Sequence, residues 1–338
     1  MTSLAFAGAG WITAIHGLAA DTVPGLRVVH VASRRGLSAG RRAEQTGAVV
    51  CHYDELPGGA DAVLVATPPA QHRQEAERAV DGGAVALVET PLAATLADAD
   101  AIVALAARGR VAYGENLVHS PAAAEAVSAC RRIGRLTYLE VRFAQGRPDW
   151  SEHRHDPSWG GGAFFDLGVH AVAVALLMAA PARVVAVEHA ELDSGRALQV
   201  DDDARVTLAF DTGLRAEVRA TWRAAAPTWD AQAASATGAV RLELVPEPSV
   251  ELNGAPLRIP QAPAVVVSEQ LFHLGYIGQL EALAADIESG RPPRSSAAFG
   301  RLVLEVVCAA YETARTGAPT PLPYTGRRDL TPHQIWRG

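Results

Sequence analysis

Lysine is missing from this chain, since all 30 of its Lys and Arg residues are arginine. The bias accompanies abundant alanine, glycine and proline and is typical of GC-rich codon usage. It excludes any reaction step in which a lysine of this chain acts as a proton donor, a Schiff-base amine or a phosphate clamp.

Cysteine is also scarce, and the three that occur, Cys51, Cys130 and Cys308, are far apart and in no CxxC pair. This spacing predicts neither a disulfide framework nor a thiolate zinc site. No apolar run reaches membrane-spanning length without a charge, and the first residues have the pattern of a strand rather than of a signal peptide. We therefore expect a protein of the reducing cytoplasm.

The chain also lacks an excess of positive charge. The net charge is −7, the pI is about 5.9, and no basic tail or stripe compensates. This charge argues against nucleic acid or an anionic membrane as a partner. With 49% hydrophobic residues over 338 positions, the composition predicts a packed globular protein of about two domains.

A glycine turn follows the first apolar run, residues 4–7, and a helical pattern comes next. Residues 8–13, GAGWIT, match GxGxxG except that Thr13 holds the third position. In such turns the first glycine permits a tight bend, and the second lets the backbone approach a pyrophosphate at the helix N-terminus. The alternative is a glycine-rich turn without a ligand. The pattern favours a dinucleotide site formed by Gly8, Gly10, Trp11 and Ile12.

The second predicted strand, Arg27–Ala32, ends in Ser33-Arg34-Arg35. An acidic residue at this place accepts hydrogen bonds from the ribose of NAD, whereas serine and arginine suit the 2′-phosphate of NADP. Ser33 and Arg34 therefore favour NADP, with NAD as the other possibility. In the alternative interpretation the two arginines are solvated loop charges.

Three further buried strands end in turns that carry polar residues. They are predicted at 61–66, 85–88 and 111–113, with helices at 38–47, 71–81 and 96–108 between the strands. Alternating units of this length predict a doubly wound parallel sheet that closes near residue 118. Ligands bind at the carboxyl ends of such strands. We therefore assign these turn residues to the cofactor site: Thr67, Pro68, His72, Glu89 and Asn116. For His72 a structural role is the alternative.

From residue 119 to residue 338 the pattern changes to strands that follow one another. They are predicted at 136–144, 184–192, 204–210, 215–220, 231–236 and 240–245, joined by short turns. This succession predicts an open-faced, mostly antiparallel sheet, whose uncovered face is a natural surface for a homodimer or homotetramer. Two last helices, at 270–289 and 297–316, pack on this sheet or return to the first domain, and residues 319–338 are predicted to be irregular.

A polar stretch begins near Asp149-Trp150 and leads through three glycines into a helix that carries Asp166 and His170. A spacing of four places both side chains on one helix face. An acid and a histidine together are good material for acid/base chemistry. A metal site would need a further ligand, for which His153, His155 and Asp156 are available. No tighter spacing motif supports one, so no metal is predicted.

Together these residues resemble the Gfo/Idh/MocA family (glucose–fructose oxidoreductase, inositol dehydrogenase and relatives) over nearly the whole chain. The resemblance implies an N-terminal Rossmann domain, a C-terminal open-faced sheet and oligomers formed through that sheet. It also implies hydride transfer between NAD(P) and a carbinol or carbonyl carbon of a sugar-like small molecule, with His170 as acid/base and Asp166 orienting the substrate. The motifs that carry it are Gly8-x-Gly10-x-x-Thr13 with His16, Thr67-Pro68-Pro69-x-x-His72, Glu89-Thr90-Pro91, Asn116 before Pro121, and Gly160-Gly161-Gly162 leading to Asp166-x-Gly168-x-His170.

One position departs from the family. Thr90 stands where the family's Glu-Lys-Pro motif has a catalytic lysine. Its hydroxyl donates one neutral hydrogen bond and brings no charge. We expect an NADPH-preferring oxidoreductase with His170, Asp166 and Thr90 at its catalytic centre, acting on a carbonyl, carbinol or imine carbon. The alternatives are a non-redox enzyme of lyase, epimerase or glycosidase type that keeps the cofactor, and a catalytically silent NAD(P) or sugar sensor.

Overall fold

The computed structural model describes residues 1–148, 155–195, 198–264, 266 and 268–338. The chain divides into two compact units. Unit 1 consists of Met1–Ala93, Ala97–His119 and Ala262–Arg301, and unit 2 consists of the remaining segments, Ala94–Leu96, Ser120–Gln261 and Leu302–Gly338. These units are defined by packing, so the predicted boundary between two functional domains at residue 118 stays a prediction. By packing, the segment Ala262–Arg301 belongs with the N-terminal residues, the second of the two possibilities for the helix at 270–289.

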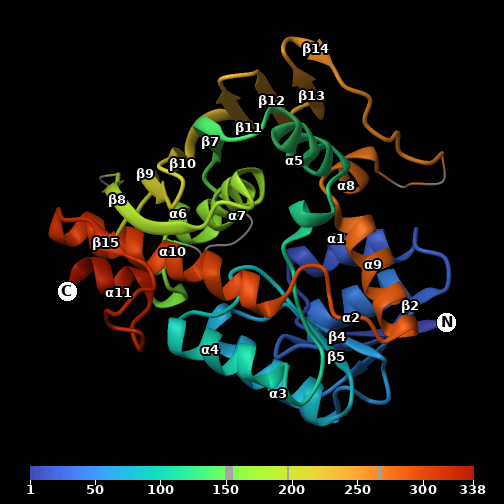
Figure 1. Cartoon of the computed structure of the whole chain (residues 1–338). Helices are drawn as coiled ribbons and strands as arrows, with labels where there is room; N and C mark the ends of the chain where they lie inside the picture. Colours follow the sequence, from blue (N-terminus) through green and yellow to red (C-terminus); the bar gives the residue numbers. More distant parts are fainter. Residues whose placement is uncertain (149–154, 196–197, 265, 267) are drawn as a thin grey trace. The chain divides into compact units, whose positions relative to one another are not determined.

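Unit 1 is built on a six-stranded parallel sheet with the strand order β3-β2-β1-β4-β5-β6. Helices α1 and α9 lie on one side of it and α3 and α4 on the other (Figure 1). This is the predicted doubly wound parallel sheet. The strands are β1 Thr2–Ala7, β2 Leu26–Ala32, β3 Val49–Cys51, β4 Ala62–Val65, β5 Val85–Val88 and β6 Val111–Tyr113, and the helices are α1 Trp11–Ala20, α2 Gly36–Thr46, α3 His72–Asp81, α4 Leu96–Leu105, α8 Glu269–His273 and α9 Tyr276–Ser289.

The strand ends of unit 1 are aligned. Ala7 pairs with Ala32 on one side and with Val65 on the other, and the register continues from Val65 through Val88 to Tyr113. Because all these strands are parallel, the turns that follow them meet at one edge of the sheet. Apolar residues of α1 and α9 pack against the sheet to form its core, among them Phe6, Ala19, Leu64, Leu87 and Leu280.

The predicted helix at 270–289 is two helices, α8 and α9. Gly275 separates them with a φ of +88°, a left-handed conformation that glycine adopts readily. The apolar pattern alone did not reveal this break, because it continues on both sides of the glycine.

Unit 2 contains a nine-stranded sheet with the order β14-β13-β12-β11-β7-β10-β9-β8-β15. Its pairs are antiparallel except for β7 with β10, in agreement with a mostly antiparallel sheet. Residues alternate between buried and exposed along β9, where Ala204, Val206, Leu208 and Phe210 face the core. The strands are β7 Leu136–Gly146, β8 Val184–Asp193, β9 Asp203–Phe210, β10 Arg215–Thr221, β11 Arg223–Ser235, β12 Ala239–Val245, β13 Ser249–Leu252, β14 Ala255–Pro256 and β15 Thr320–Pro321.

Helices of unit 2 cover one face of this sheet. Helix α5 packs on β12, and α7 packs on β7 and β10. The tail is more ordered than predicted, because it contributes the edge strand β15 and a short helix with a capping box formed by Thr331 and Gln334. The helices are α5 Pro121–Ile133, α6 Ala163–Asp166, α7 Gly168–Ala179, α10 Ala297–Thr316, which begins in unit 1, and α11 Pro332–Arg337.

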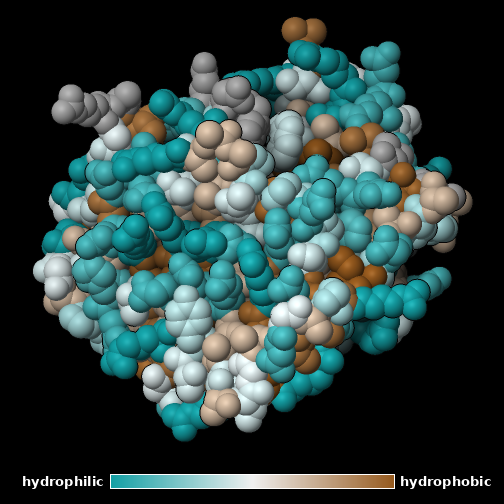
Figure 2. Space-filling view, turned by 90° about the horizontal axis from the view of Figure 1, so that it is seen from above, coloured by the Kyte–Doolittle hydropathy of each residue, from teal (hydrophilic) through white to brown (hydrophobic). Residues whose placement is uncertain are grey.

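Hydrophilic residues cover most of the face seen in Figure 2, and apolar residues lie in small areas between them. Over the described part of the chain, no single helix is long and apolar enough to cross a membrane, and one bent pair, Pro157–Asp166 with Gly168–Ala179, meets that test by length and composition only.

Candidate functional site

The glycine turn between β1 and α1 has the geometry that a dinucleotide needs. Gly8 has a φ of +124°, and a Cβ there would lie 2.5 Å from the carbonyl oxygen of Ala66. Gly10 precedes α1, has open space where a side chain would be, and provides no side-chain cap. The start of α1, at Trp11 and Ile12, thus has no capping side chain from Gly10, and such a helix N-terminus suits a pyrophosphate. The residues present fit the cofactor.

Arg42 on α2 braces this turn, and sequence reasoning missed it. Its Nε donates to the hydroxyl of Thr13 at 3.1 Å, and its Nη2 donates to the carbonyl oxygen of Gly10 at 3.1 Å. Thr13 in turn donates to the same carbonyl at 2.7 Å. Burial lowers the pKa of Arg42 from its ordinary value. The threonine in the third motif position thus supports the turn from within.

Ser33 and Arg34 lie at the carboxyl end of β2. The hydroxyl of Ser33 accepts a hydrogen bond from the backbone N–H of Arg35 at 3.2 Å, which shapes the turn. Arg34 is exposed. Burial raises the pKa of Tyr53 and of Glu75, and the nearby charge of Arg34 opposes this rise in both. No carboxylate occupies the 33–35 turn itself. An exposed cation here suits a phosphate better than a bare ribose hydroxyl.

The turn after β4 is tied to the segment after β5 by His72. Its Nε2 lies 2.7 Å from the carbonyl oxygen of Thr67, and its Nδ1 lies 3.3 Å from that of Leu92. The ring is 1% exposed, and burial lowers its pKa. Both nitrogens thus face protein carbonyls, which favours the structural role for His72. Thr67 has a buried hydroxyl without a partner, and Pro68 is exposed beside it, so both remain predicted cofactor contacts.

Glu89 and Thr90 form the corner after β5. The carboxylate of Glu89 meets Nε2 of His16 at 2.5 Å and also accepts the backbone N–H of Thr90 at 3.2 Å. His16 lies on α1, is fully buried, and packs edge-on against Tyr276 at 5.5 Å. The pair joins the helix of the glycine turn to the corner after β5. Glu89 is 7% exposed, whereas Thr90 is partly exposed and presents a neutral hydroxyl.

Asn116 follows β6 and is 3% exposed. Its amide nitrogen donates to the carbonyl oxygen of Leu274 at 2.7 Å, between α8 and α9. This bond explains why Ala262–Arg301 stays with unit 1. A contact of Asn116 with the cofactor stays a prediction, in addition to this hydrogen bond within the protein.

In unit 2 the triple glycine is shaped by Asp201, which sequence reasoning also missed. Its carboxylate accepts the N–H of Gly162 at 3.0 Å, the N–H of Phe164 at 2.8 Å and the hydroxyl of Tyr311 at 2.5 Å. A Cβ on Gly162 would lie 2.0 Å from the carbonyl oxygen of Asp201. Burial raises the pKa of Asp201, against these three donors. The only sequence signal was a run of three aspartates.

Asp166 and His170 do not share one continuous helix, so that prediction was wrong. Helix α6 ends at Asp166 and α7 begins at Gly168, with a change of direction of 43° between Pro157–Asp166 and α7. A Cβ at Gly168 would lie 2.5 Å from the ring of Phe164, so glycine lets the two helices close on each other. Asp166 is 8% exposed. His170 is partly exposed, and its ring lies nearly parallel to that of Trp229, 6.2 Å away.

The candidate metal ligands His155 and Asp156 have other contacts in the structure. His155 packs against Trp222, and Asp156 caps a short turn by accepting the N–H of Ser158. Asp149, Trp150 and His153 lie outside the described residues. Within those residues, no group of three or more His, Cys, Asp or Glu side chains is placed to hold a metal ion.

Comparisons with known proteins agree with this architecture. A family model described as an oxidoreductase family with an NAD-binding Rossmann fold matches residues 2–117, and the GFO/IDH/MocA C-terminal domain matches residues 122–245. D-xylose 1-dehydrogenase (NADP(+)) 2 of Haloferax volcanii is 28% identical over 304 residues, which cover 86% of this chain and 91% of that protein.

Two further likenesses extend the comparison. The chain is 32% identical over 165 residues to dTDP-3,4-didehydro-2,6-dideoxy-alpha-D-glucose 3-reductase of Streptomyces antibioticus, covering 47% of this chain and 50% of that protein. The structure of levoglucosan dehydrogenase in complex with NADH and L-sorbose has a TM-score of 0.85 at 19% identity, covering 96% of this chain and 99% of that one. The chain therefore belongs to the Gfo/Idh/MocA family of oxidoreductases, with an NAD(P)-binding Rossmann domain followed by the C-terminal domain of that family.

Proposed function

We propose that this chain is an NADPH-preferring oxidoreductase of a sugar-like metabolite in which His170 is the acid/base. The observation that carries the cofactor part is the aligned edge of strand ends, where an open helix N-terminus at Gly10 stands beside an exposed Arg34. The helix N-terminus suits a pyrophosphate and the guanidinium suits a 2′-phosphate. The full-length relative from Haloferax volcanii is named as NADP-dependent, which supports the same preference.

Arg34 provides the test of cofactor preference. We expect wild type to bind NADPH more tightly than NADH. Binding is followed by intrinsic tryptophan fluorescence, to which Trp11, 49% exposed beside the glycine turn, contributes. Arg34→Ala should weaken NADPH binding roughly 10–100-fold and leave NADH unchanged, because one charge-assisted contact to phosphate is lost. Arg27→Ala, which removes an exposed arginine from the other end of the same strand, is the control. Equal binding of both cofactors by wild type would overturn the assignment.

The chemistry of this proposal rests on three side chains. The nicotinamide, when bound, supplies the hydride acceptor or donor. His170 takes the proton of the substrate hydroxyl during oxidation and returns it to the carbonyl oxygen during reduction. Asp166 orients that hydroxyl, and Thr90 contributes one neutral hydrogen bond. A neutral hydroxyl in place of a charged ammonium costs roughly 10²–10³ in reaction rate. This favours activated ketones or imines as substrates.

His170 and Thr90 provide the test of the chemistry. In a screen of sugars, ketones and imines with NADPH and NADP, His170→Ala should lower kcat roughly 10²–10⁴-fold, because the proton-transfer group is removed. His189→Ala, at an exposed histidine of β8, should leave kcat unchanged. Thr90→Lys should raise activity on unactivated sugars. Unchanged turnover in His170→Ala would refute the assignment.

A second candidate is a non-redox reaction through transient oxidation, or a silent sensor. The neutral Thr90 favours it, because the charged donor of the family motif is replaced. Products that form without a net change in NADPH absorbance, detected by mass spectrometry, would select the lyase or epimerase reading. Tight cofactor binding without any product would select the sensor.

Self-association is the remaining part of the proposal. The face of the nine-stranded sheet opposite α5 and α7 carries exposed charges of both signs, such as Arg142 paired with Asp230 and Arg215 paired with Glu188. Mixed charges can complement themselves across a two-fold axis. We propose that a homodimer or homotetramer forms through this face.

A further inference from the structure

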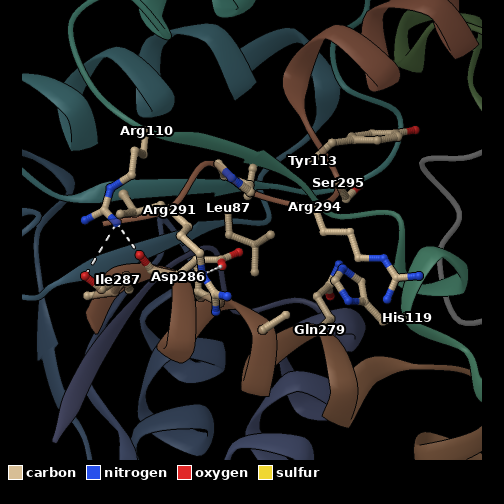
Figure 3. Close-up of a pocket in the computed structure, with 15 residues that line it drawn as sticks. Leu87, Arg110, Tyr113, His119, Gln279, Asp286, Ile287, Arg291, Arg294 and Ser295 are labelled. Atoms are coloured by element: carbon tan, nitrogen blue, oxygen red, sulfur yellow. Dashed lines mark hydrogen bonds and ion pairs between the residues drawn. The ribbon is translucent and has the colours of Figure 1, made fainter. Parts of the chain in front are cut away.

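A separate pocket lies in unit 1 under α9, against β5 and β6 (Figure 3). Figure 3 shows Arg110, Asp286 and Arg291 on one side and His119 with Arg294 on the other. None of the residues assigned to the cofactor or to catalysis lines it. The pocket therefore shares no residue with the assigned cofactor and catalytic set.

The charge of this pocket is positive. Arg110 donates to the carbonyl oxygens of Asp286 and Ile287 at 2.6 and 3.5 Å, so its charge has no direct carboxylate partner there. The carboxylate of Asp286 lies 3.7 Å from Arg291. Arg294 is exposed and, across the described segments, pairs with no carboxylate. Three guanidinium groups thus face one carboxylate.

The pocket also holds buried polar atoms without partners. Gln279 is 2% exposed, and both its Nε2 and its Oε1 lack a hydrogen bond. Ser295 is 3% exposed, and its hydroxyl is unpaired as well. Buried polar groups are normally hydrogen-bonded, so an amide and a hydroxyl left open at one pocket indicate a polar occupant.

His119 lines the pocket beside Arg294. Burial first, and then the charge of Arg294, lower its pKa to about 4, so the imidazole is neutral at pH 7. The cation and the neutral ring together offer N–H donors and an electrostatic field that favours negative charge.

We propose that this pocket is a binding site for a small oxyanion, a phosphate or carboxylate group, held by Arg294 with the donors of Gln279, Ser295 and His119. The inference does not depend on the proposed reaction. It adds to the family fold a second anion site, placed beneath the strands whose ends carry Glu89 and Asn116.

Calorimetric titration of the NADPH-saturated protein with inorganic phosphate tests the site, since the cofactor site is then occupied. Wild type should bind phosphate, and Arg294→Gln should bind it at least about tenfold more weakly. Arg27→Gln removes an exposed arginine from the same unit and should bind as wild type does. A repeat without NADPH shows whether the result holds independently of the cofactor. No binding by wild type, or equal binding by Arg294→Gln, would overturn the proposal.

Two further measurements keep the test decisive if Arg294→Gln folds poorly. Gln279→Leu removes both open amide atoms at similar size and should weaken phosphate binding without lowering the Tm. Acetate, titrated in parallel, separates the two sources: phosphate bound more tightly assigns a phosphate group, and equal or tighter acetate assigns a carboxylate. Unchanged phosphate and acetate affinity in Gln279→Leu would contradict the assignment.

Histidine NMR gives an independent readout. The charged groups that face His119 around the pocket are Arg294 and Arg291 from the segment after α9, Asp286 from α9 and Arg110 beside β6. Phosphate at saturation should raise the pKa of His119 from about 4, because an anion favours the imidazolium. A pKa that does not move while phosphate binds elsewhere would refute the site.

Discussion

At the scale of single residues, Thr90 lies in a corner that is built on the contact between Glu89 and His16. Glu89 keeps its carboxylate on the buried ring of His16, and Thr90 donates its backbone N–H to the same carboxylate. These contacts use the carboxylate of Glu89 and the backbone of Thr90. We therefore expect Thr90→Lys to add a positive charge to the corner and to keep these contacts.

Asp201 and Tyr311 yield a prediction of stability at this scale. Removing the Tyr311 hydroxyl in Tyr311→Phe takes a donor from a fully buried carboxylate and should lower the free energy of unfolding by about 1–3 kcal/mol. Burial already raises the folded-state pKa of Asp201, so the proton-linked stability is present below the unfolded value and is lost as pH rises through the folded value. Loss of the hydroxyl raises that pKa further, so the variant should suffer more at neutral than at acidic pH.

Urea unfolding at several pH values measures this effect. Tyr138→Phe is the matched control, because its hydroxyl donates to Glu140 on the exposed face of β7 and should matter little. A deficit in Tyr311→Phe that is the same at every pH would contradict the role assigned to the hydroxyl.

At the scale of elements, the features that depend on a local sequence pattern were predictable. The β1 turn with its glycines, and the strand ends before Thr67 and Glu89, follow from apolar runs that stop at glycine or proline. The breaks at Leu167 and Gly275 were not, because a glycine inside an apolar helical pattern costs only about 1 kcal/mol and is often tolerated.

Long-range contacts account for the other omissions. The first half of β11 lacks alternation, and it is joined to β7 by the pairing of Arg223 with Gly146 and of Thr228 with Ala144. Arg42 reaches Thr13 across 29 positions, and Tyr311 reaches Gly162 across 149. No sequence motif predicts either contact. The residues that hold the site in place were therefore missed, although its exposed residues were predicted. The capping box at Thr331 was readable and would have predicted α11.

At the scale of the whole molecule, the face of the nine-stranded sheet opposite α5 and α7 is the surface through which we propose self-association. If that face pairs with a second copy, Arg219→Glu, on β10, should shift the protein toward monomers, because it places a like charge beside Asp203 and reverses one side of the contact. Size-exclusion chromatography with light scattering measures the mass, with Arg27→Glu in unit 1 as control. A wild type that is monomeric at micromolar concentration would exclude the proposal.

The return of residues Ala262–Arg301 to unit 1 has an evolutionary consequence. A single genetic crossover near residue 118 would transfer the six strands without α9, and would leave the apolar partners of Leu280 and Leu283 uncovered on the sheet. Exchange of cofactor domains between relatives therefore requires two coordinated crossovers.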